Sequence, residues 1–187
     1  AATKRLDAVA QGKNGTDGNI FLAEQTGNTG LGILDGAGMV SILAPGNVTD
    51  VRTDAEKAAG TPNITAENAI VISEDGYIGT EDAPIVVLID NHMTASAESD
   101  VNVSTTENLS ITADSQTGKL NIAGDKNLTV DNTVSSAGGT GDMPIGNIVA
   151  GGNVSVNAKG DMQAADDSSL VSGDNIALNA GGSIGTA

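Results

Sequence analysis

The chain has 187 residues, of which 39% are hydrophobic, yet it contains one Phe, one Tyr, no Trp and no Cys. Aromatic side chains fill wide cores and stack on sugar rings or bases, so this composition favours a narrow core lined by aliphatic residues. Acidic residues outnumber basic ones 24 to 8, and the formal charge of -16 repels phosphate backbones and argues against a nucleic-acid partner. The 25 Gly residues and short apolar runs predict a soluble, turn-rich all-β chain without membrane insertion, and no secretion signal opens it.

Residues 1–17 are expected to form an N-terminal segment that is partly ordered or makes a first coil. From residue 18 onward a small pattern recurs, in which an Asn precedes alternating aliphatic residues. It is found in "NIFL" at Asn19, "NLSI" at Asn108, "NLTV" at Asn127, "NVSV" at Asn153 and "NIAL" at Asn175. The alternation predicts half-buried strands, and an Asn or Gly before each strand suits a tight corner with positive φ.

Two segments between these strands carry further signals. "TDAEKAA" (Thr53 to Ala59) is compatible with one or two helical turns or with a loop. In "EDAPIVVLID" the residues Ile85, Val87 and Ile89 are expected to alternate into the core, while a neighbouring coil receives their backbone hydrogen bonds.

A larger repeat contains the small one. Residues 27–46 align without a gap on residues 141–160, a shift of 114 positions, whereas "IGT" at Ile78 recurs at Ile184 after 106 positions. The difference places an insertion in Arg52 to Gly60 of the first copy, and about six extra residues fall in "TVSSAGG" of the second. We predict one copy in residues 18–125 and an incomplete copy in residues 126–187, which continues the same solenoid. Because the second copy stops after "IGTA", we expect the chain to be a segment of a longer polypeptide.

A repeat of this length built from short strands predicts several stacked coils. With about 20 residues per coil the chain supplies roughly eight or nine coils, each burying aliphatic columns against the next. Insertions are expected in loops at one side of the stack. A pair of immunoglobulin-like sandwiches is disfavoured, because the chain has no core Trp and shows a stacking repeat.

The repeats resemble those of large bacterial exoproteins of the filamentous haemagglutinin and leukotoxin-like filamentous adhesin type. The resemblance covers most of the chain from about residue 18, is poorer between residues 91 and 126, and is carried by "GNIFLAE", "GMVSILAPGNV", "NITAENAIVI", "GYIGTEDAPIVVLI" and "GSIGT". It implies a right-handed parallel β-helix, with short loop insertions, exported to the bacterial cell surface as part of an adhesin. The secretion domain that such proteins carry near their N-terminus is not found in this sequence.

Candidate catalytic residues are few. His92 is the one histidine, and an imidazole without a nucleophile or ligand cluster is usually a surface residue. Acid pairs occur at Glu74-Asp75, Glu81-Asp82 and Asp166-Asp167, but neighbouring residues in a strand point to opposite faces, so each pair is expected in a turn. The arginines are Arg5, near the terminus, and Arg52, in the expected insertion. The sequence therefore assigns no catalytic residue.

Metal and modification motifs are also weak. "GGTGDM" (Gly138 to Met143) is similar to a calcium-binding nonapeptide, but its Asp falls one place early and the unit occurs once, which favours a loop. N-x-Ser/Thr triplets are explained by Asn at corners, which leaves glycosylation open; they begin at Asn14, Asn47, Asn63, Asn108, Asn127 and Asn153. We assign no metal site and no cofactor.

The leading hypothesis is a non-catalytic segment of a secreted or cell-surface bacterial adhesin, a rigid monomeric rod that projects or that binds a host glycan or protein, if this segment has a partner at all. The alternative is a β-helical enzyme acting on an extracellular polysaccharide. Parallel β-helices include such enzymes, so fold alone does not separate the two hypotheses.

Overall fold

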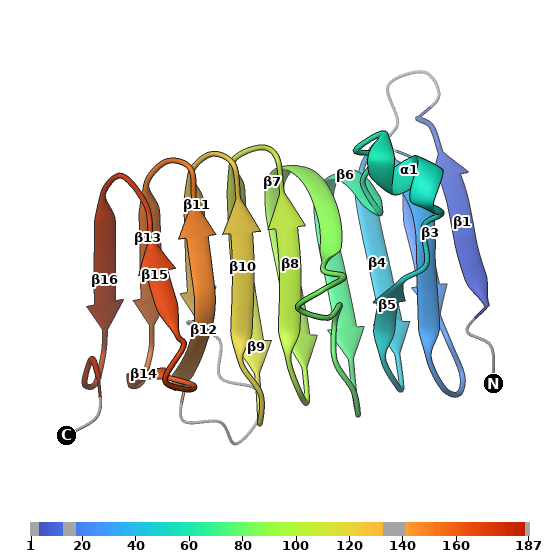
Figure 1. The fold of residues 1–187 in the computed structure, drawn as a ribbon. Coiled ribbons are helices and arrows are strands. Elements are labelled where there is room, and N and C mark those ends of the chain that lie inside the picture. Colours follow the sequence, from blue (N-terminus) through green and yellow to red (C-terminus); the bar gives the residue numbers. More distant parts are fainter. Residues whose placement is uncertain (1–3, 13–17, 133–140, 186–187) are drawn as a thin grey trace.

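The computed structural model describes residues 4–12, 18–132 and 141–185 and consists almost entirely of strands (Figure 1). Sixteen strands form one parallel sheet, and the helix among these residues is α1 (Asp54–Ala58). The strands are β1 (Arg5–Ala10), β2 (Ile20–Ala23), β3 (Thr29–Gly36), β4 (Met39–Ala44), β5 (Val48–Asp50), β6 (Ile64–Ser73), β7 (Ile85–Ala97), β8 (Val101–Thr105), β9 (Leu109–Ser115), β10 (Leu120–Gly124), β11 (Leu128–Asn132), β12 (Met143–Ala150), β13 (Val154–Ala158), β14 (Met162–Ala164), β15 (Leu170–Ser172) and β16 (Ile176–Ala180). The predicted all-β parallel solenoid is confirmed.

Each coil crosses three faces of the stack. The first face carries β5, β14, the bridging residues Ile78 and Ile184, and the first halves of β1, β3, β8, β10 and β12. The second face carries β15, the first halves of β6 and β7, and the second halves of β1, β3, β8, β10 and β12. The third face carries β2, β4, β9, β11, β13, β16 and the second halves of β6 and β7. Strands β1 and β16 therefore lie at opposite ends of the stack (Figure 1).

The coils differ in length. On the third face the smallest step between paired residues is 18 positions, from Met93 to Ile111, and the largest is 29, from Val40 to Ala69. Eight strands follow one another on this face of the described chain. They make about seven turns, fewer than the eight or nine expected, because insertions lengthen several coils beyond about 20 residues.

Alternation along each strand decides which side chains enter the interior. Ile85, Val87 and Ile89 of β7 are buried, as predicted, with 0%, 1% and 4% of their surface exposed. Val87 pairs with Thr105 of β8, so the next coil continues the ladder. Stacking aliphatic side chains in this way removes apolar area from water at roughly 25 cal/mol per Å². The core therefore needs no aromatic residue.

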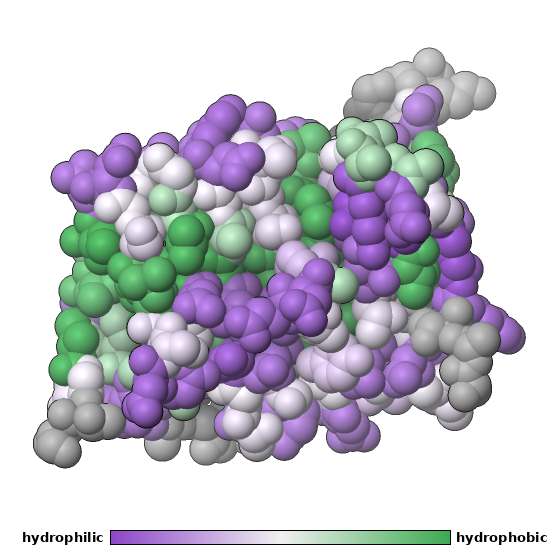
Figure 2. Space-filling model, viewed as in Figure 1, coloured by the Kyte–Doolittle hydropathy of each residue, from purple (hydrophilic) through white to green (hydrophobic). Residues whose placement is uncertain are grey.

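The last described coil has no further coil stacked on it within the described residues. Ile176 and Leu178 of β16 are 47% and 38% exposed, whereas their partners in β13, Val154 and Val156, are buried. Apolar surface is accordingly visible at the C-terminal end of the stack (left in Figure 2). Ile176 and Leu178 point inward like their buried partners. They are more exposed because no further coil covers them among the described residues.

Asparagine and aspartate side chains connect successive coils at the corners. In each case Oδ1 accepts a hydrogen bond of 2.7 to 3.2 Å from a backbone N–H of the next coil. Seven of the acceptor–donor pairs are Asp7–Ile33, Asn28–Asn47, Asn47–Tyr77, Asp100–Lys119, Asn121–Asn147, Asn127–Asn153 and Asp161–Ser183. The same bond is made in Asn19–Met39, Asn108–Asn127 and Asp142–Asp161. These bonds satisfy backbone groups where the chain leaves one face and begins another.

A glycine precedes each donor residue of these seven pairs. A Cβ atom there would lie 2.1 to 2.6 Å from the accepting Oδ1, and the glycines are Gly32, Gly46, Gly76, Gly118, Gly146, Gly152 and Gly182. None of them has positive φ. The prediction that corner glycines supply positive φ is therefore wrong for these seven positions. Glycine is needed there because it leaves room for the Asn or Asp side chain of the previous coil.

Among the described residues five glycines have positive φ, and all of them except Gly60 mark the larger repeat. Gly27 and Gly141 have φ of 84° and 77°, and Gly79 and Gly185 have φ of 61° and 87°. Both pairs are equivalent in the sequence alignment of the two copies. Val40 of β4 and Val154 of β13 are also equivalent, and they lie inward on the third face with β6, β7, β9 and β11 between their strands. The repeat therefore corresponds to five coils, although the copy boundaries at residues 18, 125 and 126 stay a prediction.

Three insertions among the described residues leave the stack at one edge, between the first and second faces. The segment 51–63 contains α1, which begins at the N-cap Thr53 in a capping box with Glu56. Loops 79–84 and 165–169 leave the same edge in later coils. The predicted insertion near Arg52 and its placement at one side of the scaffold are confirmed, whereas "TVSSAGG" lies outside the described residues.

Candidate functional site

A shallow hollow lies on the second face, over the middle of the stack. Its floor is a line of outward side chains, one from each of four successive coils, paired in register: Val86, Ser104, Ala123 and Val149. The bulkier valines stand at the two ends, and the small residues between them leave a hollow of roughly 290 Å³. Figure 2 shows an apolar band there between two hydrophilic margins. We call this surface the apolar trough.

Lys119 joins two of the inserted loops that leave the edge between the first and second faces, beside the trough. Its Nζ lies 3.2 Å from Oδ2 of Asp166 and 3.9 Å from Oε2 of Glu81. The Glu81-Asp82 and Asp166-Asp167 pairs both lie in turns, as predicted, and the third pair, Glu74-Asp75, lies in a turn after β6. Folding therefore brings two of the three acid pairs to one edge, across 47 positions between Lys119 and Asp166.

Hydrogen bonds keep the carboxylate of Asp166 ionised. The hydroxyl of Ser168 donates to Asp166 at 2.6 Å and its backbone N–H at 2.9 Å. These bonds, followed by the hydrogen bond from Lys119, lower the pKa of Asp166 to about 2. A general acid needs a pKa near the working pH, so this carboxyl is poorly suited to donate a proton at neutral pH.

The opposite margin of the trough is also acidic. Thr106 and Asp125 line the hollow from the turns that lead toward the third face. Beside them Glu107 is paired with Lys126 of the next coil. Both margins thus carry exposed carboxylates, while each contributes one ammonium group.

A buried ion pair fastens the α1 insertion to the stack. The side chains of Asp50 and Arg52 are 2% and 5% exposed, and Oδ2 of Asp50 lies 2.9 Å from Nη2 of Arg52. Asn63, which is fully buried, donates to Oδ1 of Asp50 at 2.8 Å, and Lys57 of α1 lies 3.3 Å from Oδ2. Arg52 also donates to the backbone oxygen of Thr61, so it spans the insertion. The sequence marked Arg52 only as part of a loop, because nothing local predicts its burial.

Arg5 makes a second connection to the insertion, from the first coil. It donates two hydrogen bonds of 2.7 Å to Asp7 and further ones of 2.7 and 2.8 Å to Glu56. Glu56 in turn accepts from the backbone of Thr53 at 2.7 Å. Strand β1 is therefore tied to α1 by charge-assisted bonds as well as to β3 by its ladder.

These carboxylates predict that the protein loses stability in acid. The Arg5 bonds and the Thr53 backbone bond lower the pKa of Glu56 from 4.5 to about 2. Burial opposes ionisation of Asp50, but hydrogen bonds from Arg52 and Asn63 outweigh it and hold its pKa below the ordinary value. Below pH 4.5 the unfolded chain therefore binds more protons than the folded one. We expect the thermal midpoint to be constant above about pH 5 and to fall steadily toward pH 2.

The measurement is a series of melts from pH 7 to pH 2.5 at constant ionic strength. Glu56→Gln removes one of the titrating groups and should flatten the decline, whereas Glu74→Gln, at an exposed turn, is the matched control and should leave it unchanged. A midpoint that stays level down to pH 2.5 would contradict the expectation.

The remaining singled-out residues have structural partners. His92 points outward from β7, with Nδ1 3.0 Å from the hydroxyl of Ser110 and Nε2 3.1 Å from that of Thr112. Asn63 is buried, which makes it a poor acceptor for a glycan. Asn47 and Asn127 use Oδ1 at corners. Asn14 and the first three residues of "GGTGDM" lie outside the described residues.

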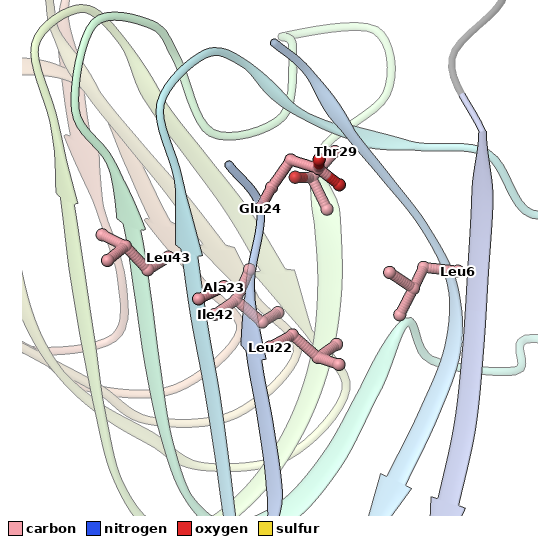
Figure 3. A pocket seen from close by; sticks show the side chains of 7 residues that line it. All are labelled: Leu6, Leu22, Ala23, Glu24, Thr29, Ile42 and Leu43. Carbon is pink, nitrogen blue, oxygen red and sulfur yellow. The ribbon is translucent and has the colours of Figure 1, made fainter. Parts of the chain in front are cut away.

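A second, smaller hollow opens at the N-terminal end of the stack (Figure 3). It measures about 70 Å³ and is lined by Leu6, Leu22, Ala23, Glu24, Thr29, Ile42 and Leu43. Thr29 is 4% exposed, and its hydroxyl has no partner among the described residues. A polar group in a hollow of this size suits one or two water molecules.

Within the described ranges no three His, Cys, Asp or Glu side chains gather as a metal site would need. The same ranges hold no helix with the length and apolar character to cross a bilayer. Compared with known proteins, the chain matches no family model, no curated sequence and no solved structure.

Proposed function

We propose that the chain is a non-catalytic segment of a secreted or cell-surface bacterial adhesin, in which it acts as a rigid rod and offers its side faces for binding. The observation that carries the proposal is the stack of about seven turns with a continuous aliphatic interior. Such an interior makes the rod stiff and leaves ligands only the outer faces. The resemblance of its repeats to the filamentous haemagglutinin type supports export and adhesion.

A polysaccharide-cleaving enzyme is the second candidate. It is favoured by one observation, the meeting of the Glu81 and Asp166 loops at Lys119 beside a hollow. Two carboxyl groups can cleave a glycosidic bond when one of them holds a proton. The ion pairing of both groups and the pKa of about 2 at Asp166 weigh against that role.

Two measurements test the proposal. Beads coated with the protein should adhere to cultured host cells or extracellular matrix more than beads coated with a stable globular protein of similar negative charge. The same protein, incubated with acidic and neutral polysaccharides with and without Ca²⁺, should release no reducing ends or unsaturated products. Turnover that disappears in the Asp166→Asn/Asp167→Asn variant would replace the adhesin proposal by the enzyme, and beads that adhere no better than the control would contradict a binding role.

A further inference from the structure

The floor of the apolar trough is flat, regular and short. Its four outward side chains succeed one another at about 4.8 Å per coil, so they cover about 14 Å along the stack. Val86 and Val149 close the two ends, and Ser104 and Ala123 leave the hollow between them. An extended peptide places residues of one side about 6.8 Å apart, so the trough has room for two such side chains.

The margins of the trough select for positive charge. Asp125 lines the hollow itself. The turns and loops at the two edges of the second face add five carboxylates and two ammonium groups, which gives a net charge of -4 within a chain of -16: Glu81, Asp82, Glu107, Asp166 and Asp167 with Lys119 and Lys126. Anionic glycans and nucleic acids would be repelled by this surface. Sugar stacking is poorly served, since Phe21 lies outward on the third face and Tyr77 at a corner of the first.

Lysine and arginine side chains have an aliphatic stem and a positively charged end, which match the apolar floor and the acidic margins of the trough. Their aliphatic stems cover apolar surface while their charged ends stay in water beside carboxylates. A stem in the hollow at Ala123 would place its cation near the carboxylate of Asp125, which lines the same hollow. Apolar floor and acidic margins therefore complement the same type of side chain.

We propose that the apolar trough binds an extended cationic segment of a partner protein, with two alternate Lys or Arg stems lying in the hollow over Ser104 and Ala123. The inference rests on the proposed binding role of the rod and names the chemistry of its partner. Backbone hydrogen bonds are not available, because every strand around the trough is paired on both sides. Affinity thus depends on side-chain stems and charge.

The test uses a fluorescent pentapeptide that alternates Lys and Val, its Glu-Val counterpart and its Ser-Val counterpart, in titrations followed by anisotropy. The Lys-Val peptide should bind, the Glu-Val peptide should not, and the Ser-Val peptide should bind at least tenfold more weakly. Ala123→Leu fills the hollow without touching the core and should weaken Lys-Val binding about tenfold. The matched variant Ala177→Leu, outward on the third face, should leave binding unchanged.

Two results would overturn the proposal. One is no binding of the Lys-Val peptide; the other is equal binding to the wild type and Ala123→Leu, which would mean unspecific attraction to a charge of -16. The bead assay keeps the two proposals separate. If beads carrying the Ala123→Leu variant adhere like the wild type, the trough is not the adhesive surface and the adhesin proposal stands. If the peptide binds but the beads do not adhere, the trough proposal stands and the adhesin proposal is contradicted.

Discussion

Replacing Gly146 by alanine is expected to lower the free energy of unfolding by about 2–4 kcal/mol, far more than a surface Gly→Ala change. The new Cβ would lie 2.2 Å from Oδ1 of Asn121. Relief requires that side chain to move, which breaks the 2.8 Å hydrogen bond that it accepts from the backbone of Asn147. Urea unfolding followed by circular dichroism, with equal m-values for both proteins, measures the loss.

A double-mutant cycle identifies the cause. In the Asn121→Ala background Gly146→Ala should cost at least 1 kcal/mol less, because its main obstacle is gone, although the backbone oxygen of Leu120 remains 3.1 Å away. Gly124→Ala is the control, because its Cβ would meet carbon atoms of the buried Leu128 and Thr105 side chains and no corner Asn; its cost should therefore be the same in both backgrounds. Equal penalties in both backgrounds would show that corner glycines do not serve to admit the Asn side chains.

Replacing Arg52 by alanine should cost about 3–5 kcal/mol, because it leaves Asp50 charged and buried. The Asp50 side chain is only 2% exposed, and Lys57, at 3.3 Å, is its remaining cation. The double variant Asp50→Asn/Arg52→Met removes both charges and keeps an acceptor for Asn63, so it should be more stable than Arg52→Ala by more than 1 kcal/mol. Urea unfolding of the three proteins tests this.

The same variant shows whether the insertion stabilises the whole stack or only α1. If Arg52→Ala loosens only α1, limited proteolysis should cut within residues 51–63 while the thermal midpoint hardly changes. The present geometry predicts the opposite, since Asn63 connects Asp50 to the backbone oxygens of Leu31 and Gly32 in the preceding coil at 3.1 and 3.2 Å. A cost below 1 kcal/mol would mean that Lys57 and water compensate the carboxylate.

The sequence by itself determined the fold class and the starts of five strands. Strands β2, β9, β11, β13 and β16 each begin directly after the Asn that was taken as a corner. Alternation with a period of two residues depends only on neighbours along the chain, so it predicted the inward residues of β7 correctly. The same local pattern, repeated after five coils, revealed the larger repeat and the α1 insertion.

Tertiary structure alone decided what lies next to what across coils. The steps between coils vary from 18 to 29 residues, so sequence spacing does not tell which side chain stands above another. For this reason the role of corner glycines, the burial of Arg52 and the meeting of Glu81, Lys119 and Asp166 were not predicted. The apolar trough has the same origin. Its floor consists of unremarkable outward residues, which become a surface only because four coils stack in register and their loops rise on both sides.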